Sequence, residues 1–176
     1  MQPASASTNF YGLLAACWAI TGFSLLMLRA LQKLLAISID AFDFSFTILQ
    51  WAVLLAIIIF MAYSEGYRGF QKGFSPRFAA RMRYLLHSGS TTERLLAPLY
   101  CMNFFNAPRK RMLVSYSVLL AILLLIFIFQ MIPQPWRGIL DAGVVVGLAW
   151  GLASTLYLCA GVLLSNGRTV QTAEGS

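Results

Sequence analysis

Charged residues are scarce in this chain of 176 residues, and their scarcity excludes an ordinary soluble domain. Lysine, arginine, aspartate and glutamate together make up 11% of the sequence, whereas hydrophobic residues make up 59%. A globular domain typically carries about 25% charged residues, because it needs a polar surface around its core. The composition therefore predicts a membrane protein.

Histidine and cysteine are too few and too scattered for a metal site or a disulfide framework. The single histidine, His87, lies in a polar segment. Cys17 and Cys159 lie within apolar runs, and Cys101 lies in a basic segment that we expect in a reducing compartment. Zinc needs a cluster of such ligands, and disulfides persist in oxidising compartments. We therefore expect no metal and no other cofactor.

Motifs that would indicate an enzyme are also missing. The sequence has neither a GxSG-like serine with a histidine in an apolar run nor two aspartates at equal depth in such runs, as intramembrane proteases would need. A phosphate-binding loop, a dinucleotide fingerprint and a haem-binding histidine pair are absent too. We therefore expect a protein that is not an enzyme.

Long apolar runs are what the sequence has in abundance. Four runs are long enough to cross a hydrocarbon core of about 30 Å, which takes roughly 20 helical residues. They cover residues 10–28, 44–63, 112–132 and 139–164. These runs do not alternate apolar with polar residues, so they predict helices rather than the strands of a barrel. The predicted fold is all-α, a polytopic membrane protein with four transmembrane helices.

The distribution of lysine and arginine predicts how these helices are oriented. Nine of the thirteen basic residues lie in residues 66–111, between the second and third runs. Short loops rich in basic residues stay on the cytoplasmic side of a membrane. We therefore expect a multi-pass protein of the cytoplasmic (inner) membrane, with this segment and both termini in the cytoplasm. Residues 1–9 would form a short N-terminal segment, and residues 166–176 a disordered tail.

The chain then divides around the basic segment. Residues 10–65 hold the first two helices, and residues 112–165 hold the third and fourth. Residues 1–10 lack the basic region that begins a secretory signal peptide, so we expect the first helix to be retained. Polar residues at helical spacing in the outer segment, residues 29–43, leave open how far this helix continues beyond Leu28.

The basic segment has the pattern of an amphipathic helix. Its apolar face comprises Phe78, Met82, Leu85 and Leu86. Cations lie on another face, as in helices that rest on an anionic leaflet. We therefore assign Arg77, Arg81 and Arg83 to contact with anionic lipid. A second apolar patch, residues 95–105, is too short to span and is either interfacial, re-entrant or packed under the bundle.

The fourth run carries small residues at a spacing that lets helices pack closely. Gly143, Gly147 and Gly151 form two overlapping GxxxG motifs, and Ser154 continues their line. In lipid, close backbone packing at such positions drives helix association. The sequence therefore predicts a helix-packing groove, whose partner is another helix of this chain, a second copy or a different protein.

Arg137 and Asp141 lie one helical turn apart at the start of the same run, where an ion pair between positions i and i+4 is available. At about 100° per residue, Asp141 lies more than a quarter turn from the centre of the glycine line, so the two features should face different neighbours. Arg29 and Lys33 reach the same outer level from the first helix. We interpret these four residues as an outer-interface charge anchor, with a transport site as the alternative.

A second charge cluster is expected at the inner interface. Glu65 ends the second run, and Arg109, Lys110 and Arg111 begin the third. An exposed ion pair here would close the helix ends and contribute about 1 kcal/mol at most. The alternative interpretation of Glu65 is a substrate gate.

These features favour a non-catalytic role. We expect an assembly, scaffold or accessory subunit of a membrane complex, whose partners are anionic lipid headgroups and a membrane protein or second copy bound through the fourth helix. The alternative is a small oligomeric transporter or channel for ions or small solutes, since four helices per chain are few for a transporter. The cations of residues 66–111 are explained by topology, so we expect no nucleic-acid partner.

Overall fold

The computed structural model describes residues 10–104, 106 and 108–174, without the side chains of Arg111 and residues 166–174. This part of the chain forms helices and no strand. In chain order the elements are α1 (Phe10–Asp40), η1 (Ala41–Asp43), α2 (Ile48–Met61), η2 (Ala62–Phe74), α3 (Ser75–Ser88), α4 (Thr91–Leu95), α5 (Ala97–Cys101), α6 (Arg109–Gln130) and α7 (Trp136–Glu174).

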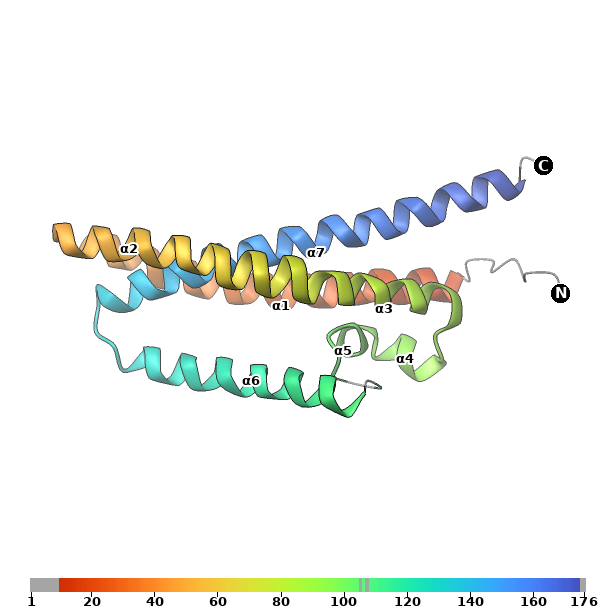
Figure 1. Cartoon of the computed structure of the whole chain (residues 1–176), viewed down its shortest axis with the longest axis horizontal. Coiled ribbons are helices and arrows are strands. Elements are labelled where there is room, and N and C mark those ends of the chain that lie inside the picture. Colours follow the sequence, from red (N-terminus) through yellow and green to blue (C-terminus); the bar gives the residue numbers. More distant parts are fainter. Residues whose placement is uncertain (1–9, 105, 107, 175–176) are drawn as a thin grey trace.

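Four helical stretches are long and apolar enough to cross a membrane, as the sequence predicted. They are Phe10–Asp43, Ile48–Ser88, Met112–Gln130 and Trp136–Ser165. Three of them lie side by side along the long axis of the molecule, and α6 lies below them (Figure 1). α1 begins and α7 ends at the same end of the molecule (Figure 1).

α1 continues well past Leu28. It has 31 residues and is therefore about 46 Å long. A line of mostly small residues, including Gly12, Ala16 and Ala19, is buried along it, and this line lets α3 and α7 approach closely. Arg29 lies outside this line and is exposed. The outer segment is thus mainly the second half of one long helix.

α2, η2 and α3 form one continuous helix of 41 residues, whereas the sequence analysis began a separate segment at residue 66. Thr47 starts it with a capping box, in which its hydroxyl accepts from the backbone N–H of Gln50. In η2 the helix widens to π-type hydrogen bonds, such as Ser75 N–H to the carbonyl of Phe70. The glycines of η2 therefore lie within the helix and do not end it.

The protein core lies where α1, α3, α5 and α7 meet. Phe78, Met82, Leu85 and Leu86 are fully buried there. The sequence correctly placed these four side chains on one face, but that face packs against protein and so cannot rest on a leaflet. Phe23 of α1 stacks on this face, with its ring centroid 5.1 Å from that of Phe78.

α4 and α5 contain the apolar patch of residues 95–105 and pack onto the bundle. The indole Nε1 of Trp18 donates to the carbonyl of Leu95 at 3.2 Å. Tyr100 and Cys101 at the end of α5 are buried in the core. Burial raises the pKa of the Cys101 thiol to about 12, and it also raises the pKa of Tyr100. Among the three possibilities for this patch, the structure therefore has it packed against the bundle.

α6 differs from the other long helices because none of its described residues is buried. It is tied to the preceding segment near its start, where the hydroxyl of Tyr116 donates to the carbonyl of Phe104 at 3.1 Å. A turn containing Pro133 and Pro135 joins its other end to α7. Between these ends its apolar side chains have no extended packing partner in the described part of the chain.

α7 runs as a helix through Glu174, although composition predicted a disordered tail from residue 166. Adding a residue to an existing helix costs far less than starting one, so a polar sequence can extend it. Residues 175–176 and the predicted N-terminal segment, residues 1–9, lie outside the described residues.

The buried position of Cys101 predicts its reactivity. In a C17S/C159S variant, the remaining thiol should react with maleimide at pH 8 at least about 100-fold more slowly in the native protein than after unfolding, because only the accessible thiolate reacts. A variant with all three native cysteines replaced and Ser88→Cys added carries an exposed thiol at the end of α3. It should react at similar rates in both states. If maleimide reacted equally slowly with both thiols in the native protein, or equally fast with both, the buried position of Cys101 would be contradicted.

Candidate functional site

The small residues of α7 face the continuous helix α2–η2–α3. A Cβ atom added to Gly143 would overlap the side chain of Ile57, and one added to Gly147 would lie 2.8 Å from Oε2 of Glu65. A Cβ atom at Gly151 would overlap the ring of Phe70. The predicted groove is therefore filled by another helix of the same chain.

A cluster of hydroxyl groups continues this contact. Oγ of Ser75 lies 3.0 Å from Oγ of Ser154 and 2.8 Å from Oγ1 of Thr155. Thr155 in turn donates to the carbonyl of Gly151 at 2.8 Å. Ser75 and Thr155 are almost wholly buried, so these bonds satisfy polar groups that would otherwise be costly inside the bundle.

A groove of about 510 Å³ opens beside the hydroxyl cluster, between α7 and the start of α3. Trp150 lines it, and its indole Nε1 donates to Oε1 of Gln71 at 2.8 Å. The groove also includes Tyr157, which is exposed. It offers a wide, open apolar surface with amide and hydroxyl groups at its edge.

Glu65 is half-buried in the contact between η2 and α7, with its carboxylate over Gly147. Arg109 and Lys110 are exposed at the start of α6, and the side chain of Arg111 lies outside the described residues. Within the described part of the chain, no ion pair joins Glu65 to these cations. The structure therefore does not bring Glu65 together with Arg109 or Lys110, and the predicted pairing with Arg111 lies outside the described side chains.

The outer anchor is only partly assembled. Nε of Arg137 lies 3.8 Å from Oδ2 of Asp141, whose side chain is 4% exposed. Gly138, between them, packs against Ala41 and the carbonyl of Ile37. Arg29 and Lys33 of α1 are exposed, and neither pairs with Asp141 in the described structure. The first helix turns apolar residues, rather than its cations, toward α7.

The three arginines assigned to lipid contact also separate. Arg77 and Arg83 are exposed on α3. Arg81 turns inward, where its guanidinium lies 4.3 Å from the ring centroid of Tyr100 and donates to the carbonyl of Asn106 at 2.9 Å. Arg81 thus holds the chain after α5 against α3.

Glu93, which was not among the predicted site residues, is buried and fully hydrogen-bonded at the start of α4. It is 5% exposed, accepts from the backbone N–H of Ser90 at 2.9 Å and accepts from Nδ2 of Asn106 at 2.5 Å. Burial alone would raise its pKa, but these hydrogen bonds and the charge of Arg81 outweigh burial and lower the pKa. The pattern Ser-x-x-Glu from Ser90 to Glu93 is a capping-box signature and was visible in the sequence.

The packing of α7 on η2 predicts that substitutions at two glycines of α7 differ in their effect on stability. Gly151→Leu should destabilise the protein by about 1–3 kcal/mol, because the new side chain must displace Phe70. Gly161→Leu is the matched control, since nothing lies within 4 Å of a Cβ atom there. Thermal unfolding of both variants in mild detergent measures the difference. Equal melting temperatures would show that α7 does not pack on η2 as described.

Glu93 predicts a pH dependence. Its lowered pKa means that the ionised carboxylate stabilises the fold above the pKa of an unfolded glutamate, near 4.5, and that this contribution disappears as the pH falls through the lower folded value. Glu93→Gln should therefore cost about 1.5–3 kcal/mol at pH 7 and progressively less as the pH falls below about 4.5. Unfolding of both proteins across this range tests it. A constant difference would contradict the charged role.

No family model matches this chain, and no curated protein or solved structure matches it either. Its role is therefore inferred from its own geometry, in which α6 has no extended packing partner among the described residues.

Proposed function

We propose that this protein is a non-catalytic assembly or accessory subunit of a membrane complex, and that α6 is the helix it presents to its partner. It would sit in the cytoplasmic (inner) membrane with both termini and the basic segment in the cytoplasm, because lysine and arginine concentrate in residues 66–111. α1 begins and α7 ends at the same end of the molecule, which is compatible with both termini lying on one side of a membrane (Figure 1).

The exposure of α6 is the observation that carries the proposal. α1, α2–α3 and α7 each pack on one another, and the glycine line of α7 is occupied by Ile57, Glu65 and Phe70. α6 has 22 residues, and beyond its contact with Phe104 most of its described apolar side chains are exposed. Helices in lipid associate by packing side chains against each other, so a free helix attached at both ends offers a surface for another transmembrane helix.

The competing function is a small oligomeric transporter or channel. Its support is the position of two carboxylates, Glu65 and Asp141, within helix contacts of the bundle rather than on its surface. Ionisable groups inside a membrane commonly mark ion or substrate pathways. Asp141, however, has Arg137 beside it, and the helix contacts around Gly138 leave it as a packed anchor near the start of α7.

Photocrosslinking in native membranes distinguishes these functions. A benzophenone amino acid at Leu120 of α6 should give an adduct with a different protein, whereas the same probe at Leu55 of α2 should not. Both side chains are similarly exposed, at 68% and 60%, so the pair is matched for accessibility. Adducts of only this chain with itself would favour the oligomeric pore. No adduct at either position would argue against a partner at α6.

A further inference from the structure

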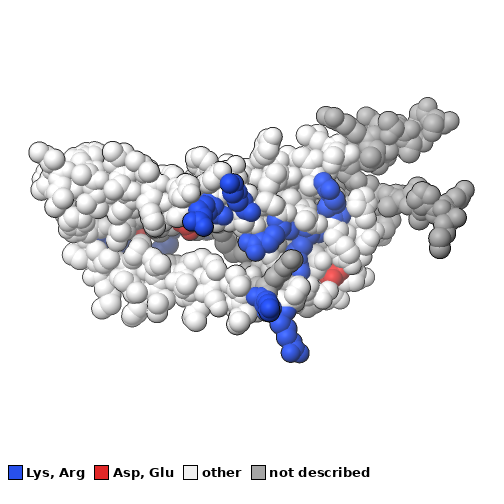
Figure 2. Space-filling view, in the orientation of Figure 1, with Lys and Arg blue, Asp and Glu red and all other residues white. Residues whose placement is uncertain are grey.

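Exposed cations from two distant segments gather on one face of the molecule. Figure 2 shows lysine and arginine side chains clustered over η2, α3 and the start of α6. The exposed members of this group, here called the basic surface, are Arg68, Lys72, Arg77, Arg83, Arg109 and Lys110. Arg81 belongs to the packing of α5 and is not one of them.

No ion pair neutralises the basic surface within the described part of the chain. Glu65, just before Arg68, has its carboxylate over Gly147 of α7. Glu93 is the only acidic residue in residues 66–111. It is buried, and its carboxylate oxygens accept hydrogen bonds from Ser90 and Asn106. The surface therefore keeps its positive charge for an external anion.

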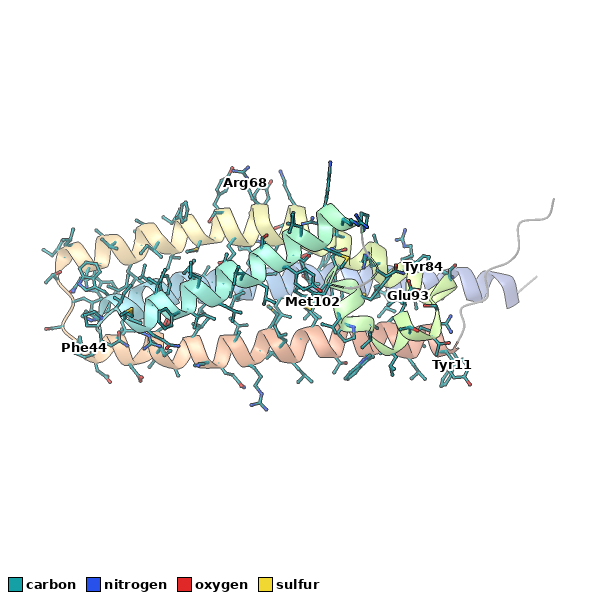
Figure 3. The ribbon with its side chains drawn as sticks, turned by 90° about the horizontal axis from the view of Figure 1, so that it is seen from below. Tyr11, Phe44, Arg68, Tyr84, Glu93 and Met102 are labelled. Atoms are coloured by element: carbon teal, nitrogen blue, oxygen red, sulfur yellow. The ribbon has the colours of Figure 1, made fainter. Side chains whose placement is uncertain are left out.

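The basic surface lies where exposed apolar surface begins on both helices. Phe60 and Tyr63 are exposed shortly before Arg68 on the continuous helix, and Leu113 and Val114 are exposed shortly after Lys110 on α6. Figure 3 shows Arg68 projecting from the side of the molecule on which α6 begins. On each helix the cations adjoin exposed apolar side chains, as at the boundary between lipid headgroups and acyl chains.

We propose that the basic surface binds anionic phospholipid, with the phosphate-bearing headgroup between η2–α3 and the first turn of α6. The acyl chains would run along the exposed apolar residues next to these cations, such as Phe60 before Arg68 and Leu113 after Lys110. A lipid fits this arrangement better than a nucleic acid or an acidic protein, because only a lipid uses both the charge and the adjoining apolar surface. Lipid binding at the basic surface depends on the proposed membrane location but does not depend on a partner at α6.

The test uses the full chain purified in a neutral detergent. Thermal unfolding is followed while phosphatidylglycerol, or phosphatidylcholine with the same acyl chains, is added. Phosphatidylglycerol should raise the melting temperature saturably, and phosphatidylcholine should not. R68Q/K110Q removes one cation from each helix, and it should raise the lipid concentration for half-maximal stabilisation about tenfold or more.

R29Q/K33Q is the matched control, because it also removes two exposed cations but lies outside the basic surface. Its half-maximal concentration should stay within about twofold of the wild-type value. In the absence of lipid, both double variants must have the melting temperature of the wild type. If R68Q/K110Q melts at a lower temperature, R83Q/R109Q is used instead.

Three outcomes would overturn the proposal. They are equal stabilisation by phosphatidylcholine, an equal loss of affinity in the control variant, and equal stabilisation by a short RNA, which would show that the surface takes soluble phosphates. The photocrosslinking experiment does not depend on any of them, so a failure here leaves the proposed subunit role to be judged separately.

Discussion

The close contact between α7 and the continuous helix Ile48–Ser88 is the constraint on which the rest of the structure depends. Gly143, Gly147 and Gly151 bring the two backbones near enough for the hydroxyl groups of Ser75 and Thr155 to bond each other across the interface. This contact fixes α3 beside the second half of α7. The core of α1, α3 and α5 is then built against the pair, with Cys159 and Val162 of α7 completing it.

Much of the helical content could be predicted from local patterns. Length and hydropathy were sufficient to find four helices that can cross a membrane, and periodicity placed Phe78, Met82, Leu85 and Leu86 on one face. The glycine spacing also predicted a close helix contact, and Gly143, Gly147 and Gly151 contact α2 and η2. That Asp141 faces a different neighbour stays a prediction. These features depend on residues that are close in the sequence.

The rest depended on contacts between distant segments. An amphipathic face does not reveal whether lipid or protein covers it, so α3 was assigned to a leaflet although α1 and α5 cover it. A run of glycines resembles a loop until the helix on the other side is known, so the break expected at residue 66 does not occur. Arg81 was counted with its neighbours because only the fold shows Tyr100 beneath it.

The assembly of the core from both ends of the chain has a consequence for biogenesis. Ala15 and Ala16 near the start of α1 share one cluster with Cys159 and Val162 near the end of α7. This cluster cannot close until the ribosome has released almost the whole chain, because contacts of such long sequence separation form only when both segments are present. Until that moment the apolar faces of α1 and α3 lack the side chains of α7 that complete their packing. The last helix to be made therefore closes a core that the first helix begins.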